Sequence, residues 1–160
     1  MLVDRLRYEA INFKYENGYN IPVHVLAGKL SNFAQLISQY AFYRTVCTTT
    51  ILMSIDEEKG PQVYKVDPAG FCQGYRGCTA GAKEQEAMTL LEKSYKKKAG
   101  GQFSADEATE AVIEALQNVI GADFKPGDIE VAISTAAKPI FRVLTVAEVE
   151  KYLNIIADKA

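Results

Sequence analysis

Residues 74–83, which read GYRGCTAGAK, are the stretch of the sequence most similar to a phosphate-binding loop. Glycines and a lysine ahead of a helix can surround a phosphate group with backbone N–H groups. A Walker A motif, however, has four residues between its glycines and then lysine and serine or threonine directly. Only three residues separate Gly77 from Gly81, and Lys83 is followed by Glu84. The spacing therefore indicates a tight turn of small residues between a strand and a helix.

The three consecutive threonines at 48–50 could suggest a threonine nucleophile. Such a nucleophile needs an activating base, which in the N-terminal class of hydrolases is a free α-amine. These threonines lie in mid-chain, inside an alternating pattern typical of a strand, and threonine is a common strand residue. We therefore interpret them as structural and predict no catalytic residue.

One histidine and three cysteines are the remaining side chains suited to chemistry. His24 is the only histidine and has no neighbouring cluster of metal-binding residues, so it is expected to be a surface residue. Cys47, Cys72 and Cys78 have unpatterned spacing, which favours reduced, buried thiols in a cytosolic or nuclear protein. The sequence therefore predicts no metal site and no cofactor.

Charged residues gather in two runs. Residues 56–58 are acidic and are expected to form a solvated turn. Lys93 and residues 96–98 are basic, as suits a helix C-terminus in water, with RNA binding as the alternative. The net charge of −2 gives no overall basic field, so nucleic acid is not a predicted partner. A membrane is not predicted either, because no apolar run approaches the roughly 20 residues of a membrane span.

The pattern of apolar residues predicts one domain over residues 1–160. Helical spacing predicts helices at 2–16, about 22–43 and 82–97, and alternation predicts strands at 46–55, 62–66, 70–76, 129–135 and 140–144, with an extended piece at 77–80. Two capping boxes, Ser104 with Glu107 and Thr145 with Glu148, predict two more helices, the first running to about 120. The order ααββββααββα keeps helices apart from antiparallel strands, which is the α+β class.

Several motifs in this order resemble the 20S proteasome α-subunit family along the whole chain. They are RYEA at 7–10, GYNIPV at 18–23, IDEEKGPQVY at 55–64, DPAG at 67–70, TAGAKEQEA at 79–87, LEK at 91–93 and FKPGDIEV at 124–131. The resemblance implies a four-layer αββα sandwich of the N-terminal-nucleophile hydrolase type. It also implies a non-catalytic subunit of a threonine-type endopeptidase complex, with no catalytic residue of its own.

The resemblance further implies partners and a location. Family members assemble with other α-subunits into a seven-membered ring that caps the proteolytic chamber, contacts the β-subunits and receives the regulatory particle. They serve ubiquitin-dependent protein degradation in the cytoplasm and nucleus. The first helix pair lies toward the β-ring, so Arg5, Tyr8, Asn12 and Tyr15 are expected interface residues.

Three departures from the family pattern carry further expectations. The chain starts about where the first sandwich helix starts, so the gate, a helix and the first strands are expected to be absent. The sandwich would then be incomplete at its N-terminus, with unpaired strand edges and an uncovered apolar face. Arg44 is not followed by the usual proline, and Ser54 stands where glycine is usual.

The alternative, an active N-terminal-nucleophile hydrolase, needs Thr, Ser or Cys at a processed N-terminus, which Met1-Leu2 does not supply.

Overall fold

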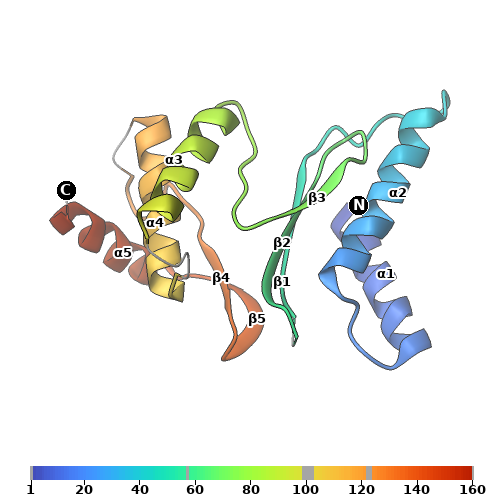
Figure 1. Ribbon diagram of the computed structural model, residues 1–160, viewed down its shortest axis with the longest axis horizontal. Helices are drawn as coiled ribbons and strands as arrows, with labels where there is room; N and C mark the ends of the chain where they lie inside the picture. The colour runs from blue at the N-terminus through green and yellow to red at the C-terminus, as the bar shows by residue number, and fades with distance from the viewer. Residues whose placement is uncertain (1, 57, 99–102, 122–123, 160) are drawn as a thin grey trace. The chain divides into compact units, whose positions relative to one another are not determined.

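The computed structural model describes residues 2–56, 58–98, 103–121 and 124–159, and their elements are drawn in Figure 1. The chain divides into two compact units, Met1–Cys78 and Thr79–Ala160, and each is described by itself. The elements run in the order α1, α2, β1, β2, β3, α3, α4, β4, β5, α5. The α+β class is confirmed. The expected fourth strand at 77–80 is wrong, because those residues form no strand.

Two helices open the first unit, α1 (Leu2–Asn17) and α2 (Val23–Gln39). The chain leaves α1 through Gly18, whose φ of +80° is a conformation that side-chain-bearing residues rarely adopt. The helix was predicted from about 22, but it begins at Val23, and Pro22 stands at its N-cap with an extended backbone. The helix ends at Gln39, before the predicted 43, because Tyr40 turns into an extended conformation.

The first unit also contains an antiparallel sheet in the order β1 (Thr50–Asp56), β2 (Gly60–Val66), β3 (Cys72–Tyr75). The Asp56 carboxylate accepts from the backbone N–H groups of Glu58 and Lys59, which closes the first hairpin. The strand predicted from residue 46 begins only at Thr50. Thr50 pairs with Val66, the last residue of β2, so residues 46–49 have no partner on β2.

Helices α1 and α2 cover one face of this sheet (Figure 1). Four buried residues, Leu6, Ala27, Leu30 and Val66, form the centre of this core. Cross-strand pairing places Leu52 and Tyr64 on the same face as Val66, and both pack against the centre. Alternation sends Ile51 and Met53 to the other face, where they are 41% and 44% exposed.

The turn between β2 and β3 docks tightly onto α2. The buried Ser31 hydroxyl donates to the carbonyl of Gly70, and the Ser38 hydroxyl donates to the carbonyl of Pro68 at 3.2 Å. Gly70 has a φ of +88°, and a Cβ there would lie 2.5 Å from Cγ of Gln35. The motif at 67–70 therefore turns the chain sharply and lets it lie directly on the helix.

Helices α3 (Glu84–Lys97) and α4 (Ala105–Ile120) open the second unit and pack on each other. The predicted capping box is confirmed, since Ser104 and Glu107 exchange both side-chain-to-backbone hydrogen bonds. Helix α4 ends at Ile120, in agreement with the predicted end near 120, and Gly121 follows it in the left-handed conformation.

The second unit ends with a hairpin, β4 (Ala132–Thr135) and β5 (Lys138–Val143), and helix α5 (Val146–Lys159). Ile113, Leu144, Val149 and Leu153 form the buried centre of its core. The strand predicted from 129 begins only at 132, although Ile129 and Val131 still pack against this core. Within the described residues, no helix is both long and apolar enough to span a bilayer.

Candidate functional site

The lysine of the glycine-rich stretch has a structural role. Its ammonium group, Nζ of Lys83, donates to the backbone carbonyl of Val119 at 2.7 Å, at the C-terminal end of α4. The last four carbonyls of a helix have no partner within the helix, so a cation there stabilises the helix end. The prediction of a structural turn rather than a phosphate site is consistent with this contact.

The threonines and the histidine lie in ordinary structural positions. Thr50 begins β1, and the exposed Thr48 donates its hydroxyl to the Val46 carbonyl at 3.1 Å. His24 is exposed in the first turn of α2, as predicted. Among the described residues, no three His, Cys, Asp or Glu side chains gather in a way that could hold a metal ion.

The cysteines correct one prediction. Cys47 is exposed rather than buried, because it lies ahead of β1 and outside the sheet. The Thr45 hydroxyl and, after it, Arg44 lower the pKa of the Cys47 thiol. Cys72 packs against the first core and is partly buried, which raises the pKa of its thiol.

The four predicted interface residues lie along one side of α1. Arg5, Tyr8, Asn12 and Tyr15 follow one another at spacings of three, four and three, which aligns them on a helix. Tyr8 is 60% exposed and Tyr15 is 91% exposed, whereas Asn12 is half-buried. The structure therefore presents two of the four as large outward-facing aromatic side chains.

Sequence reasoning missed Ile11, which is 67% exposed between the two tyrosines. With Tyr8 and Tyr15 it forms a stripe at spacings of three and four, on the side of α1 opposite the buried Leu6. We call these three residues the α1 stripe. The signal was present as a second apolar periodicity, out of phase with the core-facing one.

Arg5 contributes to the attachment of α1 to α2. Its guanidinium lies 4.8 Å from the centre of the Phe33 ring and pairs with Glu9 at 3.4 Å. Lys29 of α2 pairs with the same carboxylate at 3.0 Å and is the main cause of the lowered pKa of Glu9. Arg5 is thus anchored toward α2, while the α1 stripe faces outward.

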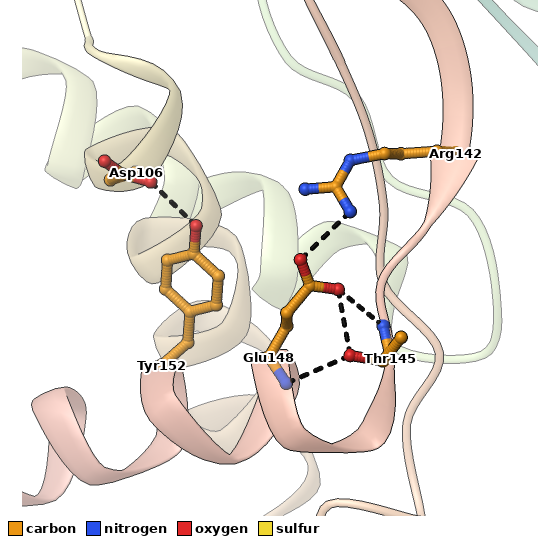
Figure 2. Close-up of polar contacts among 5 residues, drawn as sticks. All are labelled: Asp106, Arg142, Thr145, Glu148 and Tyr152. Carbon is orange, nitrogen blue, oxygen red and sulfur yellow. Dashed lines mark hydrogen bonds and ion pairs between the residues drawn. The ribbon is translucent and has the colours of Figure 1, made fainter.

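A polar cluster in the second unit was not predicted (Figure 2). Arg142 of β5 pairs with Glu148 at 3.0 Å, and Glu148 also closes the predicted capping box with Thr145 at the start of α5. Hydrogen bonds from Thr145, and then from Arg142, lower the pKa of Glu148 to about 2. The hydroxyl of Tyr152 donates to Asp106 at 2.7 Å, and this bond raises the pKa of Tyr152 to about 12.

The side chains of Asp106, Arg142, Glu148 and Tyr152 border an open groove of about 430 Å³ between α4, β5 and α5. Leu144 and Ile155 supply its apolar part. Sequence patterns could indicate only the capping box, since Asp106 and Tyr152 lie 46 residues apart and meet through folding. Beside the groove, the Arg142–Glu148 ion pair links β5 to α5, and the Tyr152–Asp106 hydrogen bond links α5 to α4.

Together, these features define an α+β protein that displays outward apolar side chains rather than a reactive cluster over the described residues. The family model for proteasome subunits matches residues 1–134. The chain is 40% identical over 157 residues to proteasome subunit alpha type-6 of Caenorhabditis elegans, covering 98% of this chain and 63% of that protein. It is equally identical over 157 residues to probable proteasome subunit alpha type-1 of Schizosaccharomyces pombe, covering 64% of that protein.

An archaeal relative is more distant. Proteasome subunit alpha of Pyrococcus horikoshii is 31% identical over 156 residues, which are 96% of this chain and 56% of that protein. The chain therefore spans less than two thirds of the length of the curated relatives it matches.

The chain belongs to the proteasome subunit family. Within that family, the relatives that it matches at 40% identity are α-type subunits, one of them an alpha type-6 subunit, also called α1.

Proposed function

We propose that the protein is a non-catalytic structural α-type subunit of the 20S proteasome core. It assembles with other α-subunits and with β-subunits into the ring that caps and gates the proteolytic chamber, and so serves ubiquitin-dependent protein degradation. The observation that carries the proposal is the collinear match to α-type relatives over nearly the whole chain. On this proposal the assembled ring receives the regulatory particle in the cytoplasm and nucleus.

The proposal includes a four-layer αββα sandwich. Two apolar surfaces support it, because each is more exposed than a finished core would allow. One is the sheet face that carries Ile51 and Met53 in the first unit. The other lies on α4, where Val112 is 55% and Ile120 is 52% exposed. Further strands over these surfaces would complete the sandwich.

The α1 stripe is the proposed contact with a neighbouring subunit, together with the predicted Arg5 and Asn12. Buried aromatic side chains supply much of the binding energy of protein interfaces. Tyr8 and Tyr15 present such side chains outward from a helix that is held on its other side by Leu6. Burial of one large apolar side chain is worth roughly 1.5–3 kcal/mol, so a stripe of three can determine association.

A native co-purification tests the proposal. The chain, with an affinity tag at its C-terminus, is expressed in Schizosaccharomyces pombe and isolated without denaturation. We expect α- and β-subunits to co-purify in constant ratio, and the combined change Tyr8→Ala and Tyr15→Ala to reduce their recovery. Phe141→Ala is the matched control, since Phe141 is 62% exposed in the other unit. A chain that is isolated without proteasome subunits would contradict the proposed function.

The alternative is an active N-terminal-nucleophile hydrolase, and a peptidase assay distinguishes it. We expect the purified chain to release no fluorophore from peptide substrates. Turnover that disappears on Thr49→Ala or Thr50→Ala would favour the hydrolase and overturn the scaffold role.

A further inference from the structure

Tyr152 adds a polar contact between α5 and α4 to the buried apolar cluster that includes Ile113 of α4 and Val149 and Leu153 of α5. Its hydroxyl donates to the carboxylate of Asp106 in the first turn of α4 (Figure 2). A tyrosine hydroxyl carries one proton, so this contact exists only while the oxygen keeps that proton. This polar contact, unlike the apolar cluster beside it, therefore depends on the chemical state of one oxygen atom.

That oxygen lies among charges of both signs. The groove beside it is lined by the carboxylates of Asp106, Glu110 and Glu148 and by the cations of Arg142 and Lys151. The groove is open, and the Tyr152 side chain is only partly buried. A group added to the hydroxyl would enter the groove rather than the core.

We propose that Tyr152 is a phosphorylation site and that its phosphate breaks the contact with Asp106 and so loosens the packing of α5 on α4. In the reaction, the tyrosine oxygen attacks the γ-phosphorus of ATP bound to a tyrosine kinase. The new O–P bond replaces the bond to ADP, and the hydroxyl proton passes to a base of the kinase. Glu148 and Glu150 precede the tyrosine, and this acidic segment is complementary to a kinase whose substrate-binding groove is basic.

The loss of this contact follows from the charges. A phosphate ester carries about −1.5 to −2 charges near pH 7 and offers acceptor oxygens where the hydroxyl was a donor. It therefore repels Asp106 instead of binding it. Arg142 is the cation placed to pair with the phosphate, because guanidinium binds phosphate through two parallel hydrogen bonds. Glu148 then loses Arg142 but keeps its bonds to Thr145, so α5 still begins at its capping box.

Two measurements on the full chain test the proposal. In the first, a tyrosine kinase and ATP are added, and modified residues are identified by mass spectrometry, with the 91% exposed Tyr15 as internal reference. We expect phosphate on Tyr152. Modification of Tyr15 while Tyr152 stays unmodified would overturn the site.

In the second, phosphotyrosine is incorporated at position 152 during synthesis, and amide exchange in α5 is followed. We expect exchange to rise about tenfold, the effect of losing one hydrogen bond to a charged group. Phosphotyrosine at position 15 is the control and should leave α5 unchanged. In Asp106→Asn the repulsion is absent, so the rise should be smaller. Unchanged exchange with phosphate at 152 would overturn the proposed loosening of α5.

Discussion

Replacement of Gly70 by alanine should be the most damaging single-methyl change in the first unit. A Cβ at this position would lie 2.5 Å from Cγ of Gln35 and 2.7 Å from the carbonyl oxygen of Ser31. Real Cβ atoms do not approach so closely, and the Ser31 oxygen is part of the α2 backbone and cannot move alone. The turn must therefore lift away from the helix.

The size of the loss follows from two contributions. A side chain in the left-handed conformation costs roughly 1–2 kcal/mol. The lifted turn also weakens the bond from the Ser31 hydroxyl to the Gly70 carbonyl, and a hydrogen bond of this kind contributes about 0.5–1.5 kcal/mol. We expect Gly70→Ala to lower the free energy of unfolding by about 2–3 kcal/mol, a large part of the roughly 5–15 kcal/mol of a typical domain.

Two other glycines of the same unit are matched controls. Gly18 has a φ of +80° but open space where its Cβ would stand, so Gly18→Ala should cost only the backbone contribution of roughly 1–2 kcal/mol. Gly28 lies inside α2 with open space and an ordinary φ, so Gly28→Ala should stabilise by about 0.5–1 kcal/mol.

Urea unfolding followed by circular dichroism gives the change in the free energy of unfolding for each of the three variants. Amide exchange in α2 serves as a local probe. The expected order of stability is Gly28→Ala, the unchanged chain, Gly18→Ala and then Gly70→Ala. If Gly70→Ala cost no more than Gly18→Ala, the close docking of this turn on α2 would be refuted.

Three further predictions concern single side chains. Lys83→Met should lower the thermal stability of the second unit, because the Val119 carbonyl loses its cation, and ATP should not change the melting temperature of either form; ATP-dependent stabilisation of the unchanged chain would restore the phosphate-loop interpretation. Iodoacetamide at pH 8 should label Cys47 before Cys72, since Cys47 is exposed with a lowered thiol pKa and Cys72 is partly buried with a raised one; peptide mapping that finds the reverse order would contradict this. The folded-state pKa of Glu148 lies below its ordinary value of 4.5, at about 2, so its contribution to stability is complete above about pH 4.5 and is lost as the pH falls toward 2; Glu148→Gln should flatten the acid part of the unfolding curve, and an unaltered curve would speak against the capping interaction.

The sequence could predict helices well because their signals are local. The capping residues Ser104 and Thr145 and the terminal Gly121 mark helix ends within one turn of chain, and all three do so in the structure. Strand ends were less predictable. Residues 46–49 have the alternation of a strand, but a strand exists only where a neighbour pairs with it, and β2 ends at Val66.

The candidate sites also differ in whether their residues lie on one element or on several. The four interface residues on α1 came from the family resemblance, and their spacing only places them along one side of the helix. Ile11 was missed because only residues named by that resemblance were considered. The cluster around Tyr152 could not be predicted, because its members come from β5 and two helices. Whether Arg5, Tyr8, Asn12 and Tyr15 touch another subunit stays a prediction.

A lysine at each end of helix α3 links it to α4. Lys83 reaches the carbonyl of Val119 where α4 stops, and Lys98 binds Glu107 where α4 begins. Between them α3 has no fully buried residue. If α3 moved along the axis of α4 by one helical turn, about 5.4 Å, both lysine contacts would break. The two lysine contacts therefore resist any shift of α3 along the axis of α4, in either direction.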